Sequence, residues 1–317
     1  MTILIIKYKR LLKTIFFIIF YSLIPMVALI FYMSLGQREM SMQTAKSETS
    51  HIVKHIKLTE EEFMSKTELF LFVLSKLDIL KDNNQQEKCS EFLSKLLEQL
   101  EFYSNIAVSD LQGNIYCSAI PLENPVNVSD RKYFINVISN RRFSLGDYQI
   151  GRIVKKPVWV AGHPILTDDG VLQGVVGVSI DLKWLNKLLS DQPLPPQSIL
   201  KVFDGHGVIL VSYPNSSEVG QKKNLDREIA YVLQNKKSPF ELKGSDGKLR
   251  VYTYSKFDPT STNEEKYVII GLDKSFIERP ADETFKKSLV LALIIVLAVF
   301  VIVFINWQLF IYPQSKT

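Results

Sequence analysis

Histidine side chains, which bind metals and transfer protons, are few in this chain of 317 residues. His51 and His55 stand four positions apart, so a helix would place both imidazoles on one face, at a spacing that can chelate a metal ion. Segment 51–55 nevertheless lacks the glutamate that a zinc-protease motif needs between two such histidines. We therefore expect a solvated helix face here and no metal site.

Motifs of the common enzyme classes are also missing from the sequence. His163 and His206 are isolated, no glycine loop of the phosphate-binding or dinucleotide-binding type occurs, and there is no Gly-x-Ser-x-Gly elbow. We expect neither catalysis nor a cofactor. A membrane-bound hydrolase is the least supported alternative, since it would need a nucleophile beside a base in a pocket.

Two apolar runs lie near the ends of the chain. Residues 14–35 carry no charge, and about twenty helical residues are enough to cross a hydrocarbon layer of roughly 30 Å. Residues 288–311 form the second and more apolar run. A basic cluster precedes the first run and resists translocation, which keeps the N-terminus in the cytoplasm; its members are Lys7, Lys9, Arg10 and Lys13.

This pattern predicts two transmembrane helices in the inner or plasma membrane, with short cytoplasmic segments at 1–13 and 312–317. Membrane lipid is then a partner, and the middle of the chain lies in the periplasm or outside the cell. A cleaved signal peptide is the alternative for the first run, because Ser34 and Gly36 form a small-x-small pair. The basic cluster accounts for most of the net charge of +5, so nucleic acid is not an expected partner.

The two cysteines of the chain, Cys89 and Cys117, both fall in the portion that we place in an oxidising compartment. A disulfide between them would close a loop of 28 residues. They could form this bond or remain two free buried thiols.

The middle portion begins with helical periodicity. Residues 36–80 contain no proline and no glycine after Gly36, and their apolar positions recur at helical intervals. A second helical stretch covers residues 86–100, and short β-branched and aromatic runs alternate with glycine turns from Tyr103 onward. We therefore expect a helical stalk at 36–101 followed by antiparallel strands.

A faint repeat divides the strand-rich part into two. Asp, Gly, Ile and Ser stand at 110, 113, 115 and 118, and the same four types return 94 residues later at 204, 207, 209 and 212. Each Asp and Gly can form a tight hairpin turn. The proline-rich segment 190–198 separates the copies, so we expect an α+β fold with tandem subdomains at 102–190 and 191–285.

Four short motifs in the first copy, each unspecific alone, occur together. They are Ser-Asp-Arg-Lys-Tyr-Phe at 129–134, Gly-Asp-Tyr at 146–148, His-Pro-Ile at 163–165, and Gly-Val-Val-Gly-Val-Ser-Ile-Asp-Leu at 174–182. In this combination the chain resembles double Cache domains, which are PAS-like sensors outside the membrane in histidine kinases, chemoreceptors and diguanylate cyclases. The resemblance covers roughly residues 36–285 and implies that the subdomain farther from the membrane holds a ligand.

The resemblance also implies which residues line the ligand pocket. The planar guanidinium of Arg131 matches a carboxylate bidentately, and aromatic neighbours exclude water and strengthen the contact. The implied ligand is a small carboxylate or similar polar metabolite. The implied lining residues are Arg131, Tyr133, Phe134, Tyr148, His163, Ser179 and Asp181.

A purely structural role is the alternative for several of these side chains. Arg131 could pair with Asp130 or Asp181, while Tyr133 and Phe134 fill the core. Trp159 and Trp184 are expected in the core in either case.

Family members that bind amino acids hold the ammonium group with two acidic residues. Ile150 and Ser179 stand at the corresponding positions of this chain. Asp181 follows Ser179 on the same face of the strand and could substitute for one acid. The departure puts amino-acid specificity in doubt.

The expected function is a small-molecule sensor module of a transmembrane signalling protein. Ligand capture would bias the long helix between two arrangements, and the first helix would form a homodimer seam. The chain ends six residues after the second run, so an output domain is either lost or supplied in trans by a cytoplasmic partner. A membrane-anchored scaffold that binds a partner protein is the alternative.

Overall fold

The computed structural model describes residues 2–191, 194–234, 237–257 and 265–311. The chain divides into two compact units. One comprises Met1–Ala45 with Lys274–Thr317, and the other comprises Lys46–Asp273.

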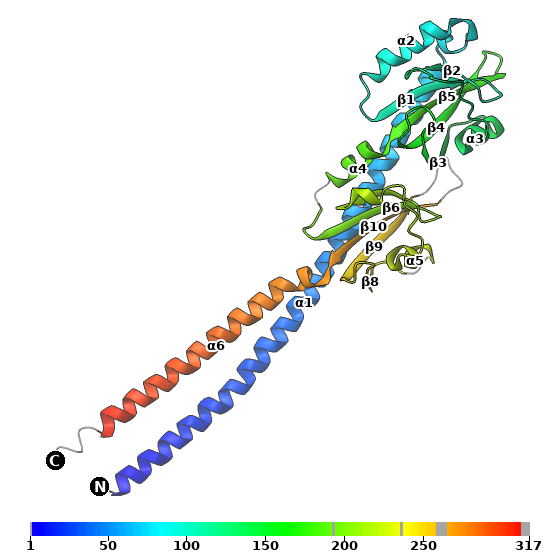
Figure 1. Ribbon diagram of the computed structural model, residues 1–317. Coiled ribbons are helices and arrows are strands. Elements are labelled where there is room, and N and C mark those ends of the chain that lie inside the picture. Colours follow the sequence, from blue (N-terminus) through cyan, green and yellow to red (C-terminus); the bar gives the residue numbers. More distant parts are fainter. Residues whose placement is uncertain (1, 192–193, 235–236, 258–264, 312–317) are drawn as a thin grey trace. The chain divides into compact units, whose positions relative to one another are not determined.

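The smaller unit contains the first part of α1 (Thr2–Ser75) and all of α6 (Lys274–Ile311) (Figure 1). Among the described residues, the segment Lys274–Ile302 is long and apolar enough to cross a membrane. Its apolar side chains are mostly exposed. An ion pair between Arg38 and Asp282 joins the two helices.

The expected first span at 14–35 is helical throughout, within α1, and several of its side chains lie outside the described set. The side chains of the basic cluster Lys7, Lys9, Arg10 and Lys13 lie outside it entirely. The short tail at 312–317 is also outside the described residues.

The larger unit contains two antiparallel sheets of five strands each (Figure 1). The sheet orders are β2-β1-β5-β4-β3 and β7-β6-β10-β9-β8, so both halves follow the same path. The first sheet comprises β1 (Tyr103–Ser109), β2 (Ile115–Ser118), β3 (Ser144–Ile150), β4 (Pro157–Leu166) and β5 (Leu172–Asp181). The second comprises β6 (Ser198–Asp204), β7 (Ile209–Tyr213), β8 (Phe240–Lys243), β9 (Leu249–Phe257) and β10 (Lys266–Asp273). The predicted α+β architecture with tandem PAS-like halves is confirmed.

Shorter helices cover and connect the sheets. Helix α2 (Gln86–Leu97) lies on β1 and β2, α3 (Lys132–Asn140) lies on β3 and β4, and α5 (Arg227–Leu233) lies beside β8. Helix α4 (Leu182–Ser190) follows β5 directly and contacts β7 of the second sheet. Short 3₁₀ turns occupy Asp78–Leu80, Asn83–Gln85 and Ser216–Glu218.

The two Asp-x-x-Gly repeats form the same turn in both sheets. The Asp110 carboxylate accepts hydrogen bonds from the backbone N–H groups of residues 112 and 114, and Asp204 does the same for residues 206 and 208. Gly113 and Gly207 close the turns at φ of +84° and +78°, a conformation that favours glycine. The repeat in the sequence therefore marks the hairpin that starts each sheet.

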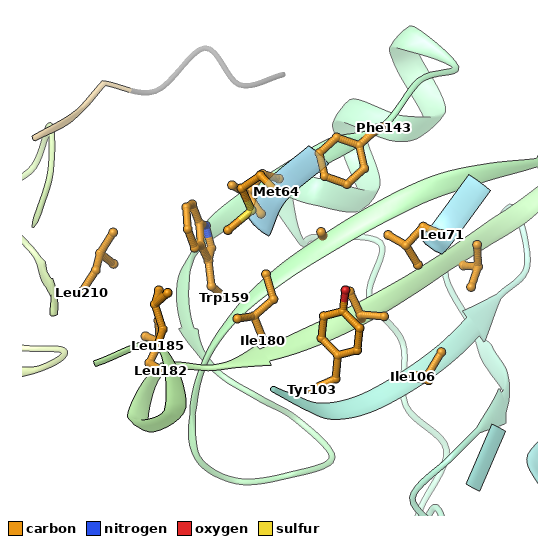
Figure 2. Packing of buried hydrophobic residues seen from close by; sticks show 14 of the residues in the cluster. Met64, Leu71, Tyr103, Ile106, Phe143, Trp159, Ile180, Leu182, Leu185 and Leu210 are labelled. Carbon is orange, nitrogen blue, oxygen red and sulfur yellow. The ribbon is translucent and has the colours of Figure 1, made fainter. Parts of the chain in front are cut away.

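The main core is continuous through the larger unit. It joins α1, through residues such as Met64 and Leu71, to one face of the first sheet and then to the second sheet (Figure 2). Trp159 is buried in this core, and Trp184 packs against it. Two smaller cores lie on the opposite faces, under α3 in the first sheet and under α5 in the second. Helix α1 therefore contributes to a core that both subdomains share.

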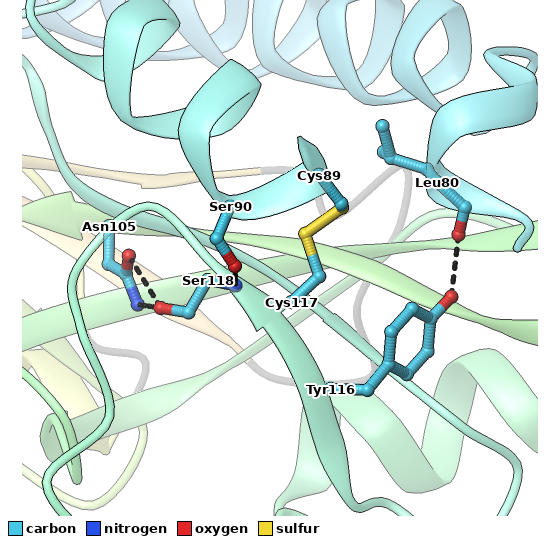
Figure 3. The surroundings of a disulfide bond; sticks show 7 residues. All are labelled: Leu80, Cys89, Ser90, Asn105, Tyr116, Cys117 and Ser118. Carbon is cyan, nitrogen blue, oxygen red and sulfur yellow. Dashed lines mark hydrogen bonds between the residues drawn. A yellow bond between two sulfur atoms is a disulfide. The ribbon is translucent and has the colours of Figure 1, made fainter. Parts of the chain in front are cut away.

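A disulfide between Cys89 and Cys117 ties α2 to β2, with the two Cα atoms 5.9 Å apart (Figure 3). Neighbouring hydrogen bonds support the same attachment. The hydroxyl of Ser90 accepts from the backbone N–H of Ser118, and the Tyr116 hydroxyl donates to the carbonyl of Leu80. The structure therefore forms the bond rather than leaving two free thiols.

Candidate ligand-binding site

A small cavity lies between the α3 face of the first sheet and the loop that joins β3 to β4. Its volume is about 50 Å³, which is enough for a few water molecules at roughly 10–15 Å³ each. The lining residues are Asn105, Ala107, Val108, Ser109, Ile115, Val126, Val128, Arg131, Tyr133, Gln149, Gly151, Arg152, Ile153, Val154, Val160, Val175, Gly177 and Ser179.

Tyr133 lies over a pair of glycines in the sheet. Gly162 of β4 and Gly177 of β5 are register partners, and a Cβ at these positions would lie 2.8 and 3.5 Å from the Tyr133 ring. A side chain at Gly162 would therefore displace the aromatic ring. Burial raises the pKa of the Tyr133 hydroxyl, so this group stays a neutral hydrogen-bonding group at the cavity wall.

Arg131 stands directly before α3 and lines the cavity with a half-buried side chain. No described residue forms a hydrogen bond or ion pair with its guanidinium. Asp130 pairs with Arg152, and Asp181 pairs with Lys156, although the charge of Arg131 also helps to lower the pKa of Asp130. Arg131 thus forms no ion pair with the described residues, and its role as a ligand contact stays a prediction.

Arg152 is a lining residue that sequence reasoning did not find. It lies in the β3–β4 loop, and its guanidinium donates two hydrogen bonds of 2.7 Å to Asp130 and one to the Asn127 carbonyl. These bonds tie the loop to the segment before α3, across the cavity. The bond to Arg152 lowers the pKa of the Asp130 carboxyl, which stays charged. Loop positions lack periodicity, so only the charge of Arg152 could have drawn attention to it.

Ser179 also lines the cavity, whereas Asp181 does not. Asp181 ends β5, and its carboxylate accepts from the Lys183 N–H at the start of α4. Burial raises the pKa of this carboxyl. The hydrogen bonds from Lys156 and the helix backbone lower the pKa by more than that, so the net shift is downward. The suggested role of Asp181 in holding an ammonium group is therefore replaced by a helix cap.

The structure places Phe134, Tyr148 and His163 outside the cavity. Phe134 is buried in the small core under α3, near the cavity but not at its wall. His163 lies on the opposite face of the sheet, where its ring meets Phe72 of α1 edge-on at 5.8 Å between ring centroids. Strand alternation explains this, because His163 shares its parity in β4 with the core residue Trp159.

Tyr148 is displaced by an irregularity in β3. The register against β4 shifts between Leu145 and Tyr148, so the alternation of faces is interrupted there. Gly146 faces Tyr133, while Tyr148 joins the main core on the other side. Its hydroxyl lies against Gly220 of the second subdomain and leaves no room for a Cβ at that glycine.

The corresponding face of the second sheet is occupied by charged side chains of the chain itself. Lys201 of β6 is buried, and its ammonium group lies 3.1 Å from Glu218, 3.2 Å from Glu228 and 3.8 Å from Asp226. Ser245 donates two further hydrogen bonds to Glu228. The second sheet therefore holds an internal ion cluster at the place where the first sheet has the cavity.

The cavity wall has a positive electrostatic character. Its charged lining residues are Arg131 and Arg152, and no carboxylate is among the described lining residues. Since Asp130 pairs with Arg152, Arg131 is the lining cation that has no ion pair with the described residues, in a wall of hydroxyl, amide and aliphatic groups. Such a site suits an anion that brings its own apolar part.

Comparisons with known proteins agree with this architecture. A segment of 151 residues is 20% identical to sporulation kinase D of Bacillus subtilis, and it covers 48% of this chain and 29% of that kinase. The ligand-binding domain of the Pseudomonas aeruginosa amino acid chemoreceptor PctB, in complex with L-Arg, superposes with a TM-score of 0.59 at 16% identity, over 74% of this chain and 97% of that domain. The ligand-binding domain of the Campylobacter jejuni chemoreceptor Tlp3, in complex with L-valine, gives 0.59 at 15% identity, over 76% and 97%.

A family model provides the assignment. The model described as Cache domain matches residues 37–281, which include the stalk, both sheets and the cavity. This range agrees with the resemblance inferred from the motifs. The chain therefore belongs to the Cache-domain family.

Proposed function

We propose that this chain is an extracytoplasmic sensor that binds a small carboxylate through Arg131. The observation that carries the proposal is the unpaired guanidinium of Arg131 in a cavity wall without acidic side chains, among the residues described. A guanidinium that leaves water gains most from a bidentate carboxylate. The Tyr133 hydroxyl and the Asn105 and Ser179 side chains supply further polar groups around it.

The same wall argues for a carboxylate without an ammonium group. The structures of PctB and Tlp3 carry amino acids, whose ammonium group needs an acceptor or a negative charge. In this chain Ile150 and Ser179 stand where acids are expected, Asp181 caps α4, and Asp130 is held by Arg152. We therefore infer hydroxy, keto or plain aliphatic acids in preference to amino acids.

A thermal-shift experiment on the full chain in detergent micelles tests the proposal. Acetate, lactate and pyruvate are compared with alanine, methylammonium and a purine. We expect an acid to raise the melting temperature, Arg131→Met to abolish the rise, and the exposed control Arg142→Met to keep it. Stabilisation by alanine alone, or a rise that survives in Arg131→Met, would refute this function. If no small molecule has any effect, the alternative of a scaffold that binds a partner protein gains.

Membrane attachment by two helices is part of the same proposal. The apolar segment of α6 and the uncharged stretch at 14–35 in α1 support it. Binding would then be relayed to an output protein rather than followed by catalysis. Reaction of a single cysteine introduced at Asp168 or at Ser47 with an impermeant maleimide on intact cells tests the topology, because both native cysteines are joined in a disulfide.

A homodimer through α1 is also proposed. Four large apolar side chains of α1 in the larger unit are exposed: Leu58, Leu69, Phe72 and Val73. A second copy of the helix could cover this strip. Leu69→Cys should form an intermolecular disulfide in membranes, whereas Asp168→Cys, on an exposed turn, should not.

A further inference from the structure

The two sheets meet through an unusual contact on the face that packs against α1. Trp159 of β4 and Lys266 of β10 come from different subdomains, and the Lys266 ammonium nitrogen lies 3.8 Å from the centroid of the Trp159 ring. A cation over an indole face is attracted by the ring quadrupole, and the attraction strengthens when water is excluded. Trp159 is 2% exposed and Lys266 is 7% exposed, so this contact is desolvated.

A buried acid accompanies this contact. Glu60 of α1 is 9% exposed, and its carboxyl forms no hydrogen bond or ion pair with the described residues. It is nevertheless the acid with the largest electrostatic effect on Lys266. The ion pairs of α1 in the larger unit are different, because Glu61 and Glu62 pair with lysines on more exposed parts of the same helix.

Several further charges act on these two groups. Lys57 and Glu61 act on Glu60 from α1 itself. Asp147 of β3, Asp204 of β6 and Lys132 of α3 act on Lys266. Burial raises the pKa of Glu60 and lowers that of Lys266, and their mutual attraction opposes both shifts. Both groups therefore carry less charge near neutral pH than they would in water, where each would be fully charged.

We propose that Glu60, Lys266 and Trp159 form a proton-responsive junction between the two subdomains and α1, which gives the sensor a second input besides its ligand. When Glu60 takes up a proton, Lys266 loses its strongest negative neighbour and depends more on the Trp159 ring. When Lys266 loses its proton, the cation over the ring disappears. In either case the contact between the sheets changes without any ligand.

The junction also has a structural link to the cavity. The Trp159 indole N–H donates a hydrogen bond of 2.6 Å to the carbonyl of Gly146, at the irregular part of β3. Gly146 in turn lies against Tyr133, with only 3.1 Å between an ideal Cβ and that side chain. This link rests on the proposed function, because it matters only if the cavity binds a ligand. The proton response itself does not depend on it.

Trp159 provides its own spectroscopic reporter. The chain contains three tryptophans, so Trp184→Phe and Trp307→Phe leave Trp159 as the only one. Emission of this full-length variant in detergent micelles is followed from pH 5.5 to 9.5, with circular dichroism at each pH as a check of folding. We expect a reversible change in emission with a midpoint near pH 7, without loss of helical signal.

Variants separate the two titrating groups. Glu60→Gln should abolish the change near neutrality, whereas the matched control Glu61→Gln on the next residue should keep it. Lys266→Arg retains a cation that does not titrate in this range, so it should keep the Glu60 transition and lose any alkaline one. An emission that does not vary with pH in the parent, or a titration unchanged in Glu60→Gln, would overturn the proposal. The experiment contains no ligand, so its failure would not affect the carboxylate proposal.

Discussion

The carboxylate of Asp130 accepts two hydrogen bonds, each of 2.7 Å, from the guanidinium of Arg152. Two adjacent residues before α3 thus differ, because Asp130 has an ion pair and Arg131 has none with the described residues. The pair also fixes the β3–β4 loop over the cavity. Both consequences follow from one bidentate contact.

Removal of this contact should increase the mobility of the β3–β4 loop and have little effect on the overall stability of the protein. In Asp130→Asn, amide hydrogen exchange of residues 151–156 should accelerate several-fold, while the melting temperature changes little, because an exposed ion pair contributes about 0–1 kcal/mol. Asp147→Asn, which breaks an exposed ion pair of 3.3 Å with Lys132, is the control and should leave that loop unchanged. Equal exchange in both variants would show that Arg152 does not hold the loop.

A methyl group on Gly162, one of the two glycines under Tyr133, should destabilise the fold. Gly162→Ala places a Cβ 2.8 Å from the ring, and such overpacking costs about 1–3 kcal/mol. Gly205→Ala is the matched control, since its Cβ would have no neighbour closer than 3.5 Å. We expect chemical denaturation to show a clear loss of stability for Gly162→Ala alone. Similar stabilities for both variants would mean that the ring moves aside freely.

The disulfide should contribute measurably to the first subdomain. It closes a loop of 28 residues, which corresponds to about 3.6 kcal/mol in the chain-entropy model. The double variant Cys89→Ala, Cys117→Ala should therefore melt several degrees lower than the parent. A reductant should lower the melting temperature of the parent and leave the double variant unaffected. A drop in the double variant under reductant would point to another cause.

The buried carboxyl of α1 predicts the sign of one pH dependence. Burial raises the pKa of Glu60 from its ordinary value of 4.5 to about 7, so the folded chain keeps a proton that the unfolded chain has released. Its contribution to the free energy of unfolding is largest below pH 4.5, declines as the pH rises to about 7, and is then constant. Melting temperatures should show a smaller decline over this range in Glu60→Gln than in the parent. Glu61→Gln should retain the decline.

The fold could be predicted from the sequence because its signals are local. Helical periodicity gave the stalk, although α1 ends at Ser75 rather than near Leu80. The Asp-x-x-Gly pairs predicted the duplicated hairpins, since side chain and glycine dictate that turn within four residues. The packing of one helix on both sheets could not be predicted in this way, because no local signal indicates it.

The site could be predicted only in part. Arg131, Tyr133 and Ser179 line the cavity, where the helix start and the strand alternation both place them. Tyr148 does not, because the register shift in β3 reverses its face, and nothing in the sequence around Gly146 announces that shift. Arg152 was missed for the complementary reason, since its position depends on a partner 22 residues earlier in the chain.

The ammonium group of Lys201 occupies the place in the second sheet that corresponds to the cavity of the first. Because this group is tethered to the chain, it is present at a constant effective concentration. Under the proposed function, the two sheets differ in that the first binds a dissolved carboxylate and the second holds a side chain of the chain itself. Truncation by Lys201→Ala would vacate that place among Glu218, Asp226 and Glu228, and added methylammonium should then raise the melting temperature of the variant and not of the parent.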